Sequence, residues 1–512
     1  MKEDNPSPPP LIEHIKGQVK DLATNVRSDA SDSLTHIDNS IGTGKEIIIP
    51  EGTFVINNEI IISHPVIVRG QKGNKIVNTN QNANGDVKIN SNDVTIESIN
   101  LSGGSNIQGI YMKSIKGLKI QHNKISTKKN GLHIDSSTVE DIDIFHNDIS
   151  SQGFGILTNH NSRNGKNLNI AFNKIYSATA DAIELNNPTS LSESESDSFK
   201  QVKIIGNTLV ADTIGSGPTA GFAIGIANTR DVVVIGNITE ISRREALHIE
   251  DNQENVIVMG NVFNGCFGDG SRILPMTGAR LPMVTNNFFI KHEMTKTGIG
   301  LWRVYDKNGC LDVNVSNNYF KGFNIGLWLD GSSFAQVEGT VIEDCNVAIK
   351  TGVSTKIVGT VISKNTPILI QGSSGSVIDG IVSLSKPTKV IEFIGATGQT
   401  GTTLKSLRAV TETITSNPTA SNIIELFPVG DLMKGRLQVT NDGSNNLMFD
   451  CDLLWDGNDL KITNMIQKAS GIFGSTIKIL ISNNHVAFSV YTASSQSFIF
   501  SYTFEGTYYK ET

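Results

Sequence analysis

Two glutamates have the residue type and the spacing that best suit catalysis in this 512-residue chain. Glu184 lies in the stretch AIELN, and Glu250 ends the stretch ALHIE. Both stretches place a small residue before alternating apolar positions, so both carboxyl groups are expected on one outward surface. Two carboxyl groups, one acid and one base or nucleophile, are what glycosidic bond cleavage usually needs.

The coil between these stretches is small at both outward positions, Gly225 and Ala227. If coils stack at strand spacing, the two glutamates lie two coils apart, about 9 to 10 Å. That separation is near the upper edge of the range of about 6.5–9.5 Å for inverting glycosidases. We therefore predict Glu184, Glu250 and Asp251 as catalytic residues, with room for a sugar ring and a water between them.

Long insertions surround the same coils, over residues 188–200, 212–221 and 264–283. In repeat proteins, insertions form loops that often lie on the binding face. Trp302 and Trp328 align on one outward column, where flat rings suit sugar faces. Packing under a loop or at a chain interface is the alternative role for this pair. The predicted substrate-binding residues are His248, Asn186, Glu245, Asp181, Arg272, Trp302 and Trp328.

Other chemistries find no support in the sequence. There is no nucleotide-binding glycine loop, no HExxH and no CxxC, so we predict no metal and no cofactor. The four cysteines are scattered and are expected to be buried free thiols. A net charge of −7 opposes nucleic-acid binding. No apolar run is long enough for membrane insertion, and no signal peptide is visible.

A repeated Asn sets the elements that must position these residues. It follows an apolar strand and precedes another apolar pair, at intervals of 24 to 34 residues. The repeat places Asn at positions Asn123, Asn147, Asn173, Asn207, Asn237, Asn261, Asn287 and Asn318. Three short strands per period and a turn Asn predict an all-β fold, a parallel β-helix in which the Asn side chains form a ladder between coils. The family resemblance described below implies that this β-helix is right-handed.

The chain divides into four expected parts. Residues 1–44 have apolar residues at helical spacing and are expected to form a short helical cap. Residues 45–394 form the β-helix that carries the polysaccharide site. Residues 395–424 are a linker or neck rich in Thr, Gly and Ser at its start. Residues 425–512 alternate without the Asn period and are expected to form an antiparallel β-sandwich.

The opening of the β-helix carries a family resemblance. The segment IIPEGTFVI at 48–56, followed by III at 60–62 and VIVRG at 66–70, resembles the opening of the pectate-lyase-like β-helix superfamily. Within it, the chain looks most like tailspikes and capsule depolymerases of tailed bacteriophages.

The resemblance implies an endo-acting hydrolase of a bacterial surface polysaccharide, either capsule or O-antigen. It also implies a homotrimer held by the C-terminal sandwich. The protein would belong to the virion, at the phage tail or baseplate, and be made in the host cytoplasm. Two alternatives stay open, a polysaccharide lyase that cleaves by β-elimination and a receptor-binding protein that binds the polysaccharide without cutting it.

Overall fold

The computed structural model describes the chain in the ranges 36–37, 45–49, 51–79, 84–103, 108–113, 115–135, 139–158, 165–186, 199–212, 220–251, 254–275, 282–292, 296–304, 312–330, 334–372, 375–393, 401–410, 414–415, 422–428, 432–441, 446–455, 457–467, 478–490, 497–498 and 500–509. The regular structure within these ranges is β-strand throughout, with no helix. The chain divides into two compact units, Met1–Phe267 with Thr277–Ala279 and Gly268–Met276 with Arg280–Thr512.

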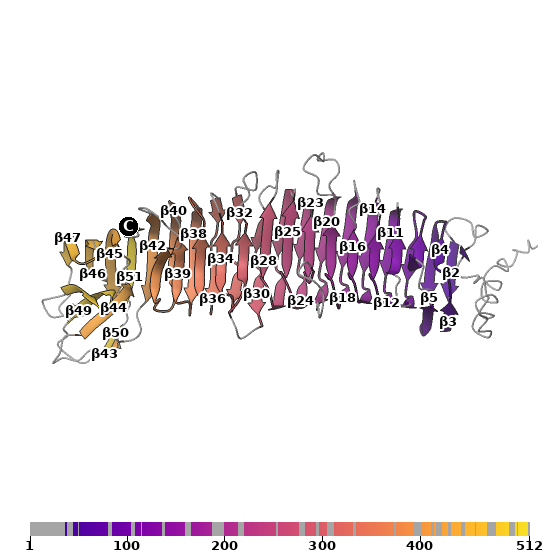
Figure 1. Ribbon diagram of the computed structural model, residues 1–512, viewed down its shortest axis with the longest axis horizontal. Helices are drawn as coiled ribbons and strands as arrows, with labels where there is room; N and C mark the ends of the chain where they lie inside the picture. The colour runs from indigo at the N-terminus through magenta and orange to yellow at the C-terminus, as the bar shows by residue number, and fades with distance from the viewer. Residues whose placement is uncertain are drawn as a thin grey trace, which may run out of the picture. The chain divides into compact units, whose positions relative to one another are not determined.

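The first unit is a parallel β-solenoid with three strands per coil. Each strand pairs in parallel with the strand three places later, which Figure 1 shows as repeated arrows coloured indigo to magenta. One stack, sheet A, holds β1 (His36–Ile37), β4 (Ile60–Ile62), β7 (Gly85–Ile89), β10 (Gln108–Met112), β13 (Leu132–Ile134), β16 (Ile156–Thr158), β19 (Ile183–Asn186), β22 (Ile224–Ala227) and β25 (Leu247–Asp251).

Two further stacks complete each coil of the first unit. The stack that follows sheet A along the chain holds β2 (Lys45–Ile49), β5 (Val66–Gly70), β8 (Thr95–Glu97), β11 (Ile115–Gln121), β14 (Val139–Phe145), β17 (Lys166–Ala171), β20 (Phe199–Ile205), β23 (Thr229–Ile235) and β26 (Glu254–Met259). The third holds β3 (Gly52–Ile56), β6 (Asn74–Asn78), β9 (Asn100–Ser102), β12 (Lys124–Thr127), β15 (Asp148–Ser151), β18 (Lys174–Ser177), β21 (Thr208–Ala211), β24 (Ile238–Ser242) and β27 (Val262–Cys266).

The second unit begins with the same type of coil. One of its stacks holds β28 (Ser271–Pro275), β31 (Ile299–Arg303), β34 (Ile325–Leu329), β37 (Val347–Thr351), β39 (Ile368–Gly372) and β41 (Lys389–Phe393). The other strands of these coils are β29 (Met283–Thr285), β30 (Phe288–Lys291), β32 (Asp312–Asn314), β33 (Tyr319–Lys321), β35 (Phe334–Gln336), β36 (Thr340–Glu343), β38 (Lys356–Lys364) and β40 (Ser376–Ser383).

The C-terminal part of the second unit is antiparallel. Its strands are β42 (Gly401–Val410), β43 (Ile414–Thr415), β44 (Asn422–Pro428), β45 (Leu432–Asn441), β46 (Asn446–Trp455), β47 (Leu460–Gln467), β48 (Lys478–Ser482), β49 (His485–Val490), β50 (Ser497–Phe498) and β51 (Phe500–Tyr509). One sheet has the order β42-β51-β45-β46-β47, and a second has the order β44-β49-β48. The Tyr502 hydroxyl donates a 2.8 Å hydrogen bond to the Leu426 carbonyl and so joins the two sheets.

The Asn ladder is confirmed, and it explains why the coils stack in register. From Asn123 to Asn237, the backbone N–H and the side-chain amide of each ladder Asn both donate to Oδ1 of the next, at 2.9–3.0 Å. The amide of Asn207 also donates to the Ile170 carbonyl. The preceding residue has a left-handed backbone, with φ of 57° at Phe172 and 64° at Gly206, which makes the sharp turn that the coil needs.

The predicted fold class is confirmed, since the chain is an all-β parallel solenoid with extra sheets at its C-terminal end. The expected helix in 1–44 lies outside the described residues, except that His36–Ile37 form β1 and pair with β4. The expected linker, 395–424, contains β42, which pairs in parallel with β40 through apolar partners such as Ile378 and Leu404. Solenoid pairing therefore extends past residue 394.

Candidate functional site

The predicted acidic site lies on sheet A of the first unit. The residues at one outward position of successive coils pair directly with one another, so they form a straight line that we term the outward column. The outward column runs through Tyr111, His133, Leu157, Glu184, Gly225 and His248. The alignment made from the sequence is therefore confirmed for these positions.

Glu184 is a buried carboxyl group, with 8% of the residue exposed. Burial raises the pKa of Glu184 well above its usual value, and the nearby charges of Asp181 and Glu250 raise it further. Its Oε2 atom has no hydrogen-bond partner among the described residues. Burial therefore favours the protonated form of Glu184, the form that a general acid needs.

Asp181 supports Glu184 from the turn before β19. Its Oδ1 atom accepts hydrogen bonds from the backbone N–H groups of Gly221 and Phe222, both at 2.6 Å. Burial raises the pKa of Asp181 to about 6, against the lowering effect of these two hydrogen bonds and of His248. Asp181 is thus mostly ionised at neutral pH and accepts the hydrogen bond of the Glu184 carboxyl. Asp181 is 2% exposed, so it is placed to hold the Glu184 carboxyl group in position.

His248 and Glu250 form the second half of the cluster. His248 Nε2 lies 3.1 Å from Glu250 Oε2, and its ring stacks on Phe222 with centroids 4.2 Å apart and planes 6° apart. Its Nδ1 atom lies 4.0 Å from Oε2 of Glu245, a residue that is almost fully buried. The Glu250 side chain is 38% exposed. Phe222 and Glu245 therefore fix the imidazole, which in turn orients a carboxylate that water can reach.

The separation of the two glutamates needs a correction. Glu184 pairs with Gly225 and then His248, whereas Glu250 pairs with Ala227. The offset of two residues along the strand raises the ideal Cα separation from about 9–10 Å to about 12 Å. The carboxyl groups still interact, because the charge of Glu250 raises the pKa of Glu184. Asn186, at the end of β19, pairs with Ala227 on the same line as Glu250.

Gly225 provides the space into which the Glu184 carboxyl group points. A Cβ atom at this position would overlap Glu184 Oε2 and would approach the Phe222 ring to 3.3 Å. Gly225→Ala is therefore expected to displace the acid and lower any cleavage rate about a hundredfold, as a shift of about 1 Å in a catalytic group does. A rate assay on Gly225→Ala, on Glu184→Gln and on the double variant checks this. If displacement of Glu184 is the cause, the double variant is no slower than Glu184→Gln alone.

Three predicted residues lie in the second unit, and two predicted side chains are not described. Asp251 ends β25 and Arg272 lies in β28, but the described side chains include neither. Trp302 and Trp328 pair in register, and their rings stack with centroids 4.6 Å apart and planes 4° apart. The stack predicted from the sequence is therefore present in the second unit.

The tryptophan stack is less open than expected. The Lys350 ammonium lies 3.4 Å from the centroid of the Trp328 ring, on the strand after it. Trp302 covers one face of Trp328 and Lys350 covers the other, so Trp328 has no face left for a sugar. Both tryptophans also pack against a buried apolar cluster of Ile299, Ile325 and Val347. These contacts favour the packing alternative for Trp328, while sugar binding by the pair stays a prediction.

Phe222 and Lys350 are the site-related residues that sequence reasoning missed. Phe222 follows an insertion whose length breaks the repeat, so its stacking on His248 has no periodic signal. Lys350 occupies the same register as Trp328 one coil later. Extending the sequence alignment of Trp302 and Trp328 by one coil would have identified it.

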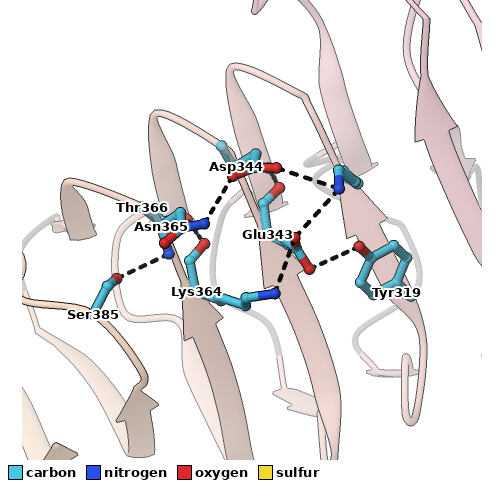
Figure 2. Close-up of polar contacts among 9 residues, drawn as sticks. Tyr319, Glu343, Asp344, Lys364, Asn365, Thr366 and Ser385 are labelled. Atoms are coloured by element: carbon cyan, nitrogen blue, oxygen red, sulfur yellow. Dashed lines mark hydrogen bonds and ion pairs between the residues drawn. The ribbon is translucent and has the colours of Figure 1, made fainter. Parts of the chain in front are cut away.

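A second polar cluster, in the second unit, does not resemble a catalytic site. Figure 2 shows Glu343 accepting a 2.8 Å hydrogen bond from the Tyr319 hydroxyl and contacting two lysines at 3.2 and 3.3 Å. The neighbouring Asp344 accepts from the Asn365 amide at 3.2 Å. Burial and Glu343 raise the pKa of Tyr319 to about 12, so this phenol stays protonated at neutral pH and is a poor base. The cluster is consistent with a structural ion-pair network.

The described part of the chain holds no group of three or more residues suited to bind a metal ion, and no helix that could cross a bilayer. Three of the four cysteines, Cys266, Cys345 and Cys451, are described and are buried free thiols, as expected.

No protein-family model matches the sequence, and no curated protein matches it. Solved structures to which the chain is similar include phage tailspike proteins. The tailspike of Pseudomonas phage phi297 is 10% identical with a TM-score of 0.44, over 90% of this chain and 89% of that one. A mutant tailspike of E. coli bacteriophage HK620 in complex with a pentasaccharide is 10% identical with a TM-score of 0.38, over 96% and 94%. The tailspike of Acinetobacter phage vB_ApiP_P1 is 9% identical with a TM-score of 0.28, over 91% and 82%. Similarity at this level carries no information about the site residues.

Proposed function

We propose that the protein binds and hydrolyses a bacterial surface polysaccharide, capsule or O-antigen, at the acidic cluster on sheet A. One observation carries the proposal. The cluster pairs a buried carboxyl group, whose pKa is raised well above its usual value, with a partly exposed carboxylate held by a histidine, and a glycine leaves space beside the buried group. Two carboxyl groups in opposite protonation states are what acid–base cleavage of a glycosidic bond requires.

The roles of the two glutamates follow from their surroundings. Glu184 would donate its proton to the oxygen of the leaving sugar as the glycosidic bond breaks. Glu250 would take a proton from a water molecule, and the oxygen of that water would bond to the anomeric carbon. His248 would keep Glu250 aimed at the water. The ideal Cα separation of about 12 Å favours this inverting route over a covalent intermediate, which needs the carboxyl groups closer together.

The predicted binding residues have different places in this proposal. Asn186 lies beside the small coil, on the line of Glu250, and is proposed to contact the sugar there. Glu245 and Asp181 are proposed to support the catalytic groups, because both are almost fully buried. Arg272 and Trp302 are proposed to contact the polysaccharide outside the cleavage point. Asp251, next to Glu250, is proposed as a reserve carboxylate.

A panel of purified capsular polysaccharides and O-antigens tests the proposal. The full-length protein is incubated with each polymer, and the products are assayed for reducing ends and for ultraviolet absorbance. Hydrolysis is expected to release reducing ends without an absorbing product. A product that absorbs would identify a β-eliminating lyase instead. Binding without fragment release would identify a receptor-binding protein.

We also propose that the chain acts as a homotrimer on a phage tail or baseplate, with the C-terminal antiparallel sheets as the trimer contact. Light scattering of the purified chain is expected to give about three times its mass of 55.2 kDa. Removing residues 401–512 should lower the number of chains per particle below three. A monomer mass for the full chain at micromolar concentration would contradict the trimer.

A further inference from the structure

The outward column extends beyond the acidic cluster, toward the start of the chain. His133 lies two strands before Glu184 on this line, and Tyr111 lies one strand further. By strand spacing, His133 is about 9 to 10 Å from Glu184. The proposed cleavage uses neither residue, although both are on the surface that a polymer aligned with the solenoid would follow.

His133 is buried without the hydrogen bonds that a buried imidazole normally makes. The residue is 8% exposed, and neither ring nitrogen has a hydrogen-bond partner among the described residues. Tyr111 holds the ring edge-on, with centroids 5.5 Å apart and planes at 69°. The Tyr111 hydroxyl is itself fixed, because it donates a 2.7 Å hydrogen bond to Asp135 Oδ2.

The protonation state of His133 defines what it can bind. Burial lowers the pKa of His133, so the imidazole is neutral at neutral pH. A neutral imidazole offers one N–H donor and one nitrogen acceptor. Sugar hydroxyl groups both donate and accept, so they match this pair. The Asp135 carboxylate close by disfavours an acidic sugar at the same place.

Unpartnered polar atoms recur along the outward column. Both nitrogens of His133, Oε2 of Glu184 and Nδ1 of His248 have no hydrogen-bond partner among the described residues. Leaving a buried polar group unpaired is destabilising, so several such groups on one line call for an explanation. Nδ1 of His248 faces the buried Glu245, whereas a polar polymer lying along the column would offer partners to His133 and Glu184.

We propose that His133, with Tyr111 and Asp135, forms a binding subsite for a neutral sugar residue, two coils from the cleavage point. The subsite rests on the proposed function, because it assumes that the polymer lies along the outward column. It makes His133 a substrate-binding residue with no part in the bond-breaking step.

The test is a substitution for which the fold itself offers a precedent. Leu157 occupies the position of His133 one coil later, so His133→Leu should be tolerated by the coil. His133→Gln keeps one donor and one acceptor. His122→Leu is the matched control, because His122 is an exposed histidine away from sheet A. Melting temperatures confirm that each variant folds.

The probe is an array of purified bacterial capsular polysaccharides and O-antigens, followed by titration calorimetry and cleavage kinetics with the best-bound polymer. His133→Leu is expected to weaken binding about tenfold or more, in line with two lost hydrogen bonds. KM should rise while kcat stays within about twofold. His133→Gln should recover part of the affinity, and His122→Leu should bind like the unmodified protein.

Failure of the subsite and failure of the proposed function are distinguishable. Unchanged affinity in His133→Leu overturns the subsite, while loss of cleavage in Glu184→Gln would still support the function. Weaker binding in His133→Leu together with full cleavage by Glu184→Gln keeps the subsite and overturns the catalytic assignment. If the unmodified protein binds none of the polymers on the array, the function and the subsite both fall. Should His133→Leu not fold, equal binding by His133→Gln and by Tyr111→Phe overturns the subsite.

Discussion

Replacing Glu184 by Gln is expected to slow polysaccharide cleavage by at least about a hundredfold while leaving binding intact, because loss of a general acid typically has an effect of that size. Gln has the size of Glu and can donate the hydrogen bond that Asp181 accepts, but it has no acidic proton. Glu250→Gln should have a similar effect, because an amide cannot take a proton from water. The measurement is the rate of reducing-end release.

A matched control separates these effects from a general change in surface charge. Glu240 is an exposed glutamate on β24 of the same unit, so Glu240→Gln should cleave normally. Normal cleavage by both Glu184→Gln and Glu250→Gln would place the active site elsewhere. Loss of cleavage at Glu250 alone would leave the base in place and reassign the acid.

The raised pKa of Glu184 gives the Glu184→Gln variant a second expected property, a change in the pH dependence of its stability. The folded protein keeps the Glu184 proton at pH values where an unfolded glutamate, with a pKa of about 4.3, has lost it. The folded state then binds more protons, so the free energy of unfolding contributed by this group falls as pH rises above about 4.3. Glu184→Gln lacks this loss. The melting temperature of Glu184→Gln minus that of the unmodified protein should therefore increase as pH rises, while the variant's activity is lost.

Asn207→Ala is expected to destabilise the solenoid by about 3–5 kcal/mol. The Asn207 amide donates to the Ile170 carbonyl and to Asn237 Oδ1, and its own Oδ1 accepts two hydrogen bonds from Asn173. Alanine removes these hydrogen bonds and leaves buried groups in the neighbouring coils unpaired. Chemical denaturation followed by circular dichroism gives the difference.

The ladder also provides its own comparison. In the second unit Asn318 is followed by Thr340, whose hydroxyl accepts from the Asn318 N–H at 3.4 Å and donates to the Val315 carbonyl at 2.7 Å. Asn207→Thr should therefore fall between Asn207→Ala and the unmodified protein. Asn169→Ala is the control, because the Asn169 side chain makes a single 3.3 Å contact with Asp143 on the outer surface. Equal stability of Asn207→Ala and Asn169→Ala would contradict the ladder's role.

The solenoid and the alignment of its coils could be predicted because the signal is periodic. A one-residue error in a strand would turn its inward Ile and Val residues to solvent, so the apolar pattern permits one register. That register placed Glu184, Gly225 and His248 on one line, and the strand pairs confirm it. Strand spacing alone underestimated the distance between the glutamates, because it ignored the position along each strand.

The contacts that could not be predicted come from segments without a period. Phe222 and the N–H groups that hold Asp181 follow an insertion, and the path of an inserted loop is not encoded by repeat spacing. The periodic sequence pattern also carries no information about protonation states. The pKa of Glu184 depends on how completely its neighbours exclude water, which is a property of the assembled fold.

The strand β42 belongs both to a parallel stack of the coils and to the C-terminal antiparallel sheet. Its residues pair in parallel with β40, the last long strand of the coils, and antiparallel with β51 in the C-terminal sheet. An open edge of a parallel stack would recruit strands from other molecules, as fibril ends do. With β51 on its far side, β42 offers no such template, because its backbone hydrogen bonds already run in both directions. The antiparallel sheet therefore ends a repeat that could otherwise grow from molecule to molecule.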